Sequence, residues 1–374
     1  MKYMITVIGA GILGASCAYH LAKKGEDVTI IDREEPGRAS HAAAGIVCPW
    51  LTQRRNKDWY VLVKNGARYY PDLVNQLNED GESNTGYEKV GALHLHRDPA
   101  IIEKMYQRGV ERRKDAPEIG ELTKLNEEET QAYFPALGTE FQSVHIAGGA
   151  RVNGRALKDS LLRAAQKHGA RYVNADATLI RDGNRVSAVH AGQETIDVDQ
   201  VIDTTGAWSN QLLSDLGLQF NVRSQRAQIL HLELPDQDPG NWPVIIGLNK
   251  LYLLTNRSGR VIVGATHEDD VGFDHRATAE GIHEILNNVL SAAPGLNHAT
   301  FKEVRVGFRP FTPNSLPLIG PAPKTENLFV ANGLGSSGLT SGPYLGYLLS
   351  QLATGQDVEI DLTPYNVEQA MDET

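Results

Sequence analysis

The chain opens with MKYMITVIGAGILGASCAYHLAKKGEDVTIIDRE, residues 1–34, and this stretch carries the clearest structural signal in the sequence. An apolar run from Met4 to Ile8 predicts a strand, the glycines after it predict a turn, and the residues up to Lys24 have the pattern of a helix. A second apolar run, Val28–Ile31, ends in Asp32. A strand, a glycine turn, a helix and an acid-tipped second strand together predict a dinucleotide-binding unit.

Each glycine of this turn has its own mechanical role. Gly9 permits the tight turn, Gly11 lets the backbone approach a pyrophosphate, and Gly14 lets the helix lie close to the sheet. The N-terminus of the helix then faces the phosphates. Asp32 stands where a ribose hydroxyl would be held. A secretory signal is excluded because the glycines interrupt the apolar run and a second strand follows.

The composition excludes several classes of protein. With 374 residues, 41% hydrophobic and 22% charged, the chain is expected to be a soluble globular protein of one large domain or two interleaved domains. No run reaches the roughly 18 apolar residues of a membrane span, so no integral membrane segment is expected. A formal net charge of −10 argues against a nucleic-acid partner. Cys17 and Cys48 offer neither metal-ligand spacing nor a disulfide framework, which suits the reducing cytoplasm.

Several segments before residue 130 have readable patterns. Residues 36–46 are mostly small and resist assignment to helix or strand, so they predict a loop that can bring bare backbone against a flat ring. The pattern predicts a long core helix over 57–77, an alternating strand over 86–96 and a charged amphipathic helix over 99–114. Glu127–Glu129 predict a helix start and not a metal site, because no His or Cys joins them at ligand spacing.

The middle of the chain predicts mainly strands, with one helix among them. Runs of antiparallel strands outside a doubly wound pattern suggest a separate sheet that covers the nucleotide domain. The predicted elements are a strand over 144–152 that contains Gly148 and Gly149, a helix over 155–168, strands over 171–180 and 185–190 joined by a turn at Gly183 and Asn184, a strand over 195–203, and strands over 223–233 and 250–265, the last with a hairpin turn at Asn256–Gly259.

A second glycine-rich stretch, Asn327–Gly338, precedes a helix that extends to Leu352. It could mark a second nucleotide site, for example for NAD(P)H. Fewer than twenty residues follow Gly355, however, and no second acid-tipped strand is evident. The better interpretation is that this loop and helix N-terminus close over the far end of the same ligand, where the positive end of the helix dipole would stabilise a reduced, anionic ring.

A set of ordered motifs resembles those of a known family. The chain resembles the FAD-dependent D-amino acid oxidase superfamily and, within it, is most similar to glycine oxidases and the small subunits of D-amino acid dehydrogenases. The resemblance spans essentially the whole chain, which makes the set far more specific than any single motif. The motifs are Gly9–Gly14 with Asp32, Ser40–Gly45, Thr205–Ser209, Gly259–Thr266 and Gly307–Gly320.

The resemblance implies a fold of mixed α/β class, in which a Rossmann-type FAD-binding domain is interleaved with an antiparallel β-sheet substrate domain. The FAD-binding domain is expected in three pieces, at residues 1–88, 145–220 and 305–374. The substrate-binding domain is expected at 89–144 and 221–304.

The resemblance also assigns residues to FAD. Ala177 matches the position whose backbone holds the adenine. The FAD is expected to be noncovalent, because His41 is offset by one residue from the attachment point of some relatives and the C-terminal third lacks cysteine. The expected cofactor-binding residues are Gly9, Gly11, Gly14, Asp32, Ser40, Ala43, Ala44, Gly45, Ala177, Gly206, Trp208, Gly335, Ser337, Gly338 and Leu339.

Three residues are expected at the substrate. Arg309 matches the family arginine that binds the substrate carboxylate, which a guanidinium can hold bidentately. Tyr252 matches the tyrosine that contacts substrate, and His267 stands where glycine oxidases carry an apolar side chain. Leu334 and Ser336 replace a histidine and an arginine found in relatives, so the substrate remains open.

The implied reaction is FAD-dependent oxidative deamination of a small amino acid, such as glycine, sarcosine or a D-amino acid. The α-hydride passes to flavin N5, and the imine hydrolyses to a 2-oxo acid. The absence of a second redox motif favours O2 as the acceptor. The alternatives are a dehydrogenase that passes electrons to a quinone or partner protein, and would associate with a membrane, and a redox-silent FAD-binding protein. The oligomeric state stays open, with a homo-oligomer among the outcomes.

Overall fold

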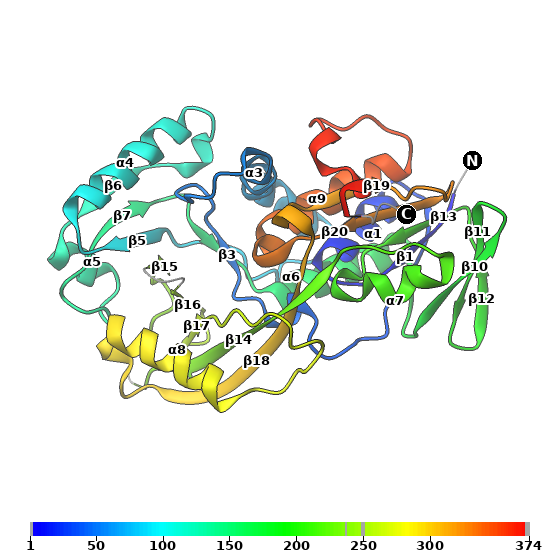
Figure 1. Cartoon of the computed structure of the whole chain (residues 1–374). Helices are drawn as coiled ribbons and strands as arrows, with labels where there is room; N and C mark the ends of the chain where they lie inside the picture. The colour runs from blue at the N-terminus through cyan, green and yellow to red at the C-terminus, as the bar shows by residue number, and fades with distance from the viewer. Residues whose placement is uncertain (1–2, 236–237, 248–250, 371–374) are drawn as a thin grey trace.

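The computed structural model describes residues 3–235, 238–247 and 251–370. Its described strands form four sheets, of six, eight, three and three strands. Figure 1 shows the six-stranded sheet and the small sheet β10–β12 on the right, and the eight-stranded sheet on the left. A parallel nucleotide-type sheet beside a large, mainly antiparallel sheet confirms the predicted α/β fold class.

The six-stranded sheet has the order β19-β20-β13-β1-β2-β9. All neighbours are parallel except β19, which pairs antiparallel with β20. Strands β1 and β2 are those predicted at the start of the chain. The bounds are β1 Met4–Ile8, β2 Asp27–Ile31, β9 Arg171–Val173, β13 Gln200–Asp203, β19 Leu318–Pro321 and β20 Leu328–Asn332.

Helices cover this sheet. Helix α1 (Ile12–Lys23) contacts both α6 (Gly154–Lys167) and α9 (Gly338–Ala353), and α9 also contacts α3 (Lys57–Glu79). Helix α1 is buried from Ile12 to Ala22 because helices pack on it from two sides. The sequence predicts all four helices, and the structure confirms them with ends that differ by a few residues.

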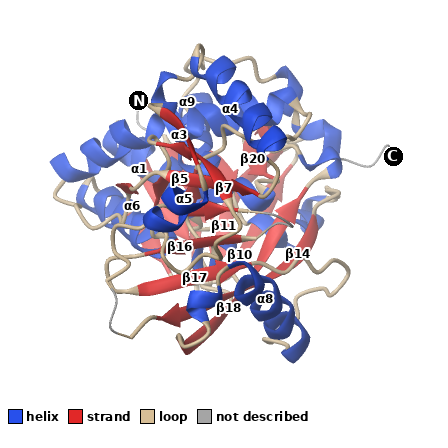
Figure 2. Cartoon of the chain, turned by 90° about the vertical axis from the view of Figure 1, so that its left-hand side faces the viewer, coloured by secondary structure: helices blue, strands red, loops and turns tan. Residues whose placement is uncertain are grey.

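The eight-stranded sheet has the order β18-β14-β17-β16-β15-β5-β7-β6, and only the β15–β5 pair is parallel. In Figure 2, α4 lies at the top of the view and α8 near the bottom, with most strands of this sheet between them. Helix α4 contacts β5, β6 and β7, and α8 contacts β14 and β17. The bounds are β5 Ala92–His96, β6 Leu122–Leu125, β7 Gln142–Ile146, β14 Arg223–Glu233, β15 Val244–Ile246, β16 Tyr252–Thr255, β17 Arg260–Gly264, β18 Thr300–Phe311, α4 Pro99–Arg113, α5 Glu127–Tyr133 and α8 Ala279–Ala292.

Two small sheets and two short helices accompany these larger elements in the part of the chain that the structure describes. The sheets have the orders β10-β11-β12 and β3-β8-β4. The bounds are β3 Ile46–Val47, β4 Glu88–Lys89, β8 Ala150–Arg151, β10 Ala177–Asp182, β11 Arg185–Ala191, β12 Glu194–Asp197, α2 Ala39–Ala42 and α7 Ser209–Leu213.

Four predicted strands are wrong as single elements. The strands predicted over 86–96, 144–152, 171–180 and 195–203 each divide into two, and in every case the two halves belong to different sheets. The chain switches sheets at turns that local alternation does not reveal. One such turn is at Asp199, whose N–H donates to the Met4 carbonyl at 2.9 Å and whose side chain accepts from the Met4 N–H.

Other predictions need smaller corrections. The loop over 36–46 contains the short helix α2, which the small residues of that segment conceal. The strand predicted over 250–265 is the hairpin β16–β17, and Lys250 lies outside the described residues. Strand β18 was not predicted, although Val304, Val306 and Phe308 alternate with other residues over part of its length.

Strands β14 and β18 form a long antiparallel pair that extends from the eight-stranded sheet toward the nucleotide-type sheet (Figure 1). At that end, the Phe308 N–H donates to the Gly37 carbonyl at 2.9 Å, and Arg38 forms a bridge with Phe308. The pair therefore connects the large sheet to the loop after β2. Because β18 also crosses the predicted boundary at residue 305, the division into two domains remains a prediction.

Candidate active site

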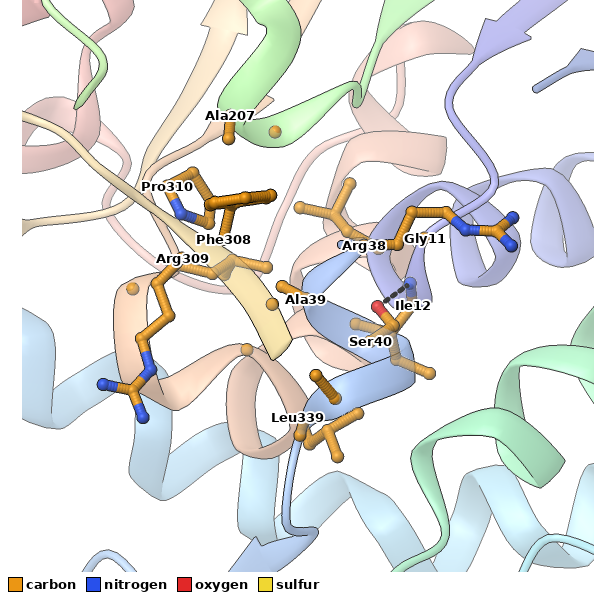
Figure 3. Close-up of a pocket in the computed structure, with 18 of the residues that line it drawn as sticks. Gly11, Ile12, Arg38, Ala39, Ser40, Ala207, Phe308, Arg309, Pro310 and Leu339 are labelled. Carbon is orange, nitrogen blue, oxygen red and sulfur yellow. Dashed lines mark hydrogen bonds between the residues drawn. The ribbon is translucent and has the colours of Figure 1, made fainter. Parts of the chain in front are cut away.

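A cavity of about 760 Å³ lies between the nucleotide-type sheet and the eight-stranded sheet. This volume is within the range of small-molecule and cofactor sites. Its lining runs from the glycine turn after β1, past the loop that contains α2 and the N-terminus of α9, to Tyr252 and Arg309. Figure 3 shows Arg38 and Arg309 extending in opposite directions within this site. We call the part near Gly9 the nucleotide end and the part near Arg309 the substrate end.

The first glycines of the nucleotide end are required by close packing. Gly9 has a φ of +95°, and a Cβ there would lie 2.7 Å from the Thr204 carbonyl oxygen. A Cβ on Gly14 would overlap the Gly9 carbonyl oxygen. Gly11 differs, because a Cβ there would meet only Ser40 Oγ, at 3.5 Å. The protein itself does not require a glycine at 11, so the space beside it suits a ligand.

Asp32 lies at the end of β2 as predicted, and its side chain is 9% exposed. Its carboxylate accepts hydrogen bonds from the Ala10 N–H at 2.5 Å and the Glu34 N–H at 2.6 Å. Arg38 Nη1 lies 3.5 Å from Asp32 Oδ1. Arg38 Nε is buried and has no hydrogen-bond partner in the described chain. A donor in that state suits the oxygen atoms of a phosphate or ribose group.

The loop after β2 brings backbone and small side chains to the cavity. Ser40 Oγ accepts from the Ile12 N–H at 2.9 Å and so occupies one amide at the start of α1 (Figure 3). Ala43, Ala44 and Gly45 follow it in the lining. A Cβ on Gly45 would overlap the Val152 carbonyl oxygen. This strip of bare backbone is where the sequence predicts contact with a flat ring.

The N-terminus of α9 also lines the cavity. Residues 334–340 all contribute, which includes the predicted Gly335, Ser337, Gly338 and Leu339. No side chain caps this helix, and no acidic residue lies in its first turn. Ser337 Oγ instead donates to the Leu334 carbonyl at 2.8 Å. The positive end of the α9 dipole is therefore available to an anionic ring.

Three other predicted cofactor residues lie along the same wall. Gly206 and Trp208 line the cavity, and the Trp208 ring stacks on Phe273 with centroids 5.1 Å apart. Ala177 lines it at the start of β10, where its N–H donates to Asp176 Oδ1 at 3.1 Å. The glycine turn, the buried Asp32, the buried Arg38 Nε and the N-terminus of α9 are groups that fit FAD.

At the substrate end, strand register brings distant residues onto one face of the eight-stranded sheet. His94 is paired with Ile246, Ile246 with Tyr252, and Tyr252 with Gly264, across β5, β15, β16 and β17. Residues opposite one another in neighbouring strands share a face. His94, Ile246 and Tyr252 all line the cavity, and Arg309 joins them from β18.

Arg309 is half-buried and lies among neutral groups. Its Nη1 donates to Gln225 Oε1 at 3.3 Å, and no carboxylate in the described part of the chain forms an ion pair with it. Burial lowers its pKa below the ordinary arginine value, while the nearby Tyr252 opposes that shift. Burial likewise raises the pKa of Tyr252, and Arg309 opposes the rise. The structure thus brings the predicted Arg309 and Tyr252 together.

His267 lines the rim of the cavity, in the loop after β17, with an exposed side chain. Its predicted role at the substrate remains a prediction. Among the described side chains, no group of three or more His, Cys, Asp and Glu is arranged to hold a metal ion. No described helix is both long enough and apolar enough to cross a membrane.

Several lining residues were not predicted from the sequence. Cys48 Sγ lies 3.7 Å from His94 Nε2, and both side chains are buried. Burial lowers the pKa of His94 to about 3 and raises the pKa of Cys48 to about 12, so both are neutral at pH 7. Arg38, which also lines the cavity, and Gln225, which bonds to Arg309 from outside the lining, were also missed. A cation six residues after Asp32 could have pointed to Arg38, but only tertiary pairing reveals the other three.

Comparison with known proteins places the chain in a family. The model of the FAD dependent oxidoreductase (DAO) family matches residues 4–352. An uncharacterised oxidoreductase, YurR, of Bacillus subtilis (strain 168) is 54% identical over 96% of this chain and 97% of its own length. The crystal structure of iminodiacetate oxidase from Chelativorans sp. BNC1 is 44% identical, with a TM-score of 0.94, and covers 97% of this chain and 98% of that one.

A more distant structure has the same fold. The crystal structure of glycine oxidase from Geobacillus kaustophilus is 25% identical, with a TM-score of 0.86, and covers 98% of both chains. These matches confirm the predicted family, fold class and cofactor.

Proposed function

Because the chain belongs to the family of FAD-dependent oxidoreductases that act on the C–N bonds of amino acids and amines, we propose that its substrate is a small amino acid of the glycine type. The observation that carries this proposal is the state of Arg309. A partly buried guanidinium with a neutral hydrogen-bond partner, and with no ion pair to a carboxylate among the described residues, is suited to an incoming carboxylate.

FAD, when bound, supplies the oxidising power by accepting a hydride from the substrate carbon. The chain's own residues hold the substrate. Arg309 would bind the carboxylate through two N–H groups, and Tyr252 beside it would limit how the substrate turns. This arrangement would fix the orientation of the C–H and C–N bonds relative to the N-terminus of α9.

No general base is assigned in the described cavity. The carboxylates that line it, Asp32, Glu35, Asp176 and Asp215, belong to the nucleotide end. His94 is neutral at pH 7, but its ring is hydrogen-bonded to Cys48. The substrate amine is therefore proposed to bind without its extra proton, which solvent would take up. The rate should accordingly rise with pH until the amine is fully deprotonated.

The names of two relatives support a narrower substrate class for the proposal. Glycine oxidase and iminodiacetate oxidase act on glycine and on an N-substituted glycine, as their names state. We propose glycine or an N-substituted glycine such as sarcosine or iminodiacetate. A panel of these three with D-alanine, assayed for glyoxylate or pyruvate, tests the class. Turnover of D-alanine alone would contradict it.

The proposed electron acceptor is O2. Oxidation of glycine by O2 and water would give glyoxylate, ammonia and hydrogen peroxide. The test compares peroxide formation in air with reduction of an artificial dye under anaerobic conditions. Fast dye reduction with little peroxide would show that the protein is a dehydrogenase. No turnover with any donor would favour a redox-silent FAD-binding protein.

The FAD is proposed to be noncovalent. His41 is followed by backbone and small side chains in the cavity lining, and neither cysteine lies in the C-terminal third of the sequence. Acid precipitation should leave a colourless pellet and a yellow supernatant. Flavin that stays with the pellet would show a covalent bond.

A further inference from the structure

We infer that Gln225 is a positioning residue that keeps the Arg309 charge unpaired by holding Asp269 one side chain away from it. The inference rests on the proposed role of Arg309. Gln225 lies on β14, directly opposite Arg309 on β18. It is 6% exposed, so its amide is removed from solvent.

The amide of Gln225 has two different neighbours. Its Oε1 accepts from Arg309 Nη1 at 3.3 Å, and its Nε2 donates to Asp269 Oδ1 at 3.0 Å. Asp269 also pairs with Arg223 on its outer side. The order is therefore a cation facing the cavity, a neutral amide, a carboxylate and a second cation at the surface. The donor and acceptor ends of the amide match this order in one orientation only.

A neighbouring arginine shows what the amide prevents. Arg226, the next residue on β14, donates to Glu268 from Nε at 3.0 Å and from Nη2 at 2.6 Å, and its Nη1 lies 3.1 Å from an oxygen of Asp274. These carboxylates raise the pKa of Arg226, whereas burial lowers the pKa of Arg309. The two arginines differ in their partners. Arg226 is neutralised within the protein, and Arg309 keeps its charge for a ligand.

A glutamate in place of Gln225 would put a carboxylate at the position of Oε1. This introduced carboxylate would form an ion pair with Arg309 and would compete with the substrate carboxylate for the same N–H groups. Methionine at that position would remove both hydrogen bonds and add no charge. Gln225→Glu therefore tests whether the Arg309 charge must stay unpaired. Gln225→Met tests only whether the Arg309 guanidinium must be held in place.

The experiment uses the FAD-loaded protein and acetate, a carboxylate without an oxidisable amine, titrated by its effect on flavin absorbance. We expect Gln225→Glu to weaken acetate binding by at least about tenfold and Gln225→Met by about threefold. With a substrate that the enzyme oxidises, Gln225→Glu should raise KM by a similar factor. It should change kcat much less, because saturating substrate displaces the introduced carboxylate from Arg309.

Gln225→Glu within twofold of wild type, or Gln225→Met as weak as Gln225→Glu, would overturn the inference. Arg309→Met separates it from the proposed function. If Arg309→Met loses acetate binding and Gln225→Glu does not, the inference alone fails. If Arg309→Met binds acetate normally, the proposed function fails.

A second variant covers the case in which Gln225→Glu does not retain FAD. Asp269→Ala removes the half-exposed anchor of the Gln225 amide at the surface, so the fold should tolerate it. Released from Asp269, the amide should hold Arg309 less well, and acetate should bind about threefold more weakly. Wild-type acetate affinity in both Asp269→Ala and Gln225→Met would overturn the inference.

Discussion

The nucleotide end of the cavity is made mainly by backbone, whereas the substrate end is made by side chains that meet across strands. At the nucleotide end, Gly9, Gly14 and Gly45 leave no room for a Cβ. At the substrate end, Arg309 and Tyr252 come from strands far apart in the sequence. Substitutions at the nucleotide end should therefore act through steric overlap. Substitutions at the substrate end should remove a chemical group and leave the fold intact.

The largest effect is expected from Gly14→Ala. Its Cβ would overlap the Gly9 carbonyl oxygen, and backbone cannot move away as a flexible side chain can. We expect little folded, yellow protein, measured as soluble yield and flavin absorbance. Gly11→Ala is the matched control. It should fold with a normal unfolding transition and lose only FAD affinity, because its Cβ would make an ordinary contact with Ser40 Oγ at 3.5 Å. Equal soluble yield and flavin absorbance in the two variants would show that steric overlap does not distinguish Gly14 from Gly11.

At the substrate end, Arg309→Met should keep FAD and lose catalysis. Removing one partner of a buried charge pair costs about 2–5 kcal/mol, so kcat/KM should fall by roughly thirty- to several-thousand-fold. The measurement is steady-state kinetics on protein with a normal flavin spectrum. Arg309→Lys keeps the charge without the planar fork and should lie between Met and wild type. A variant that loses FAD together with activity would show that the two ends are not separable in this way.

Asp32→Asn tests a buried side chain at the nucleotide end. Asparagine retains the size of Asp32 but weakens the acceptor for the Ala10 N–H and removes the charge opposite Arg38. Hydrogen bonds to charged groups contribute about 1.5–3 kcal/mol, so the FAD dissociation constant should rise by roughly ten- to a hundredfold. Reconstitution of the apoprotein, followed by quenching of FAD fluorescence, measures it. Unchanged affinity would mean that the Asp32 carboxylate does not contribute to FAD binding.

The smallest effect concerns pH and compares two buried neutral histidines, one inside α1 and one at the substrate end. Burial lowers the pKa of His20, in α1, and of His94, at the substrate end, from 6.5 to about 3. Between those values the unfolded chain binds one more proton per histidine than the folded chain. Stability should therefore fall as the pH falls below 6.5, by up to about 1.4 kcal/mol per pH unit for each histidine.

Urea unfolding of FAD-saturated protein between about pH 6 and pH 4.5 provides the measurement. His20→Gln and His94→Gln should each reduce the slope of stability against pH by up to one proton. A reduced slope in only one variant would show that the other histidine is protonated in the folded protein. The surroundings of α1 and the substrate end would then differ in polarity.

The same contrast explains how much could be predicted from the sequence. The glycine turn, Asp32 and the helix α1 form one continuous motif, so their mutual arrangement follows from their spacing. The bond between Gln225 and Arg309 depends on the register of β14 and β18, and β18 was not predicted as a strand. Arg309 and Tyr252 were assigned from the family resemblance, and their proximity became evident only in the structure.

The division of strands marks a second limit. Alternation continues smoothly across residues 195–203, yet β12 belongs to one sheet and β13 to another. The turn between them is stabilised by Asp199 and Met4, which are distant in sequence. The pattern of apolar residues predicts that a residue is in a strand but not which sheet it joins, because that choice depends on partners elsewhere in the chain.

Strand β18 has a further consequence for ligand binding. It carries Arg309 next to Phe308, and the Phe308 N–H bonds to Gly37 in the loop that lines the nucleotide end. We expect a ligand that orders either end to order the other as well, because this one strand contacts both. We therefore expect positive cooperativity between FAD and a carboxylate ligand. Thermodynamic reciprocity requires that each raise the affinity of the other by the same factor, so acetate should lower the FAD dissociation constant.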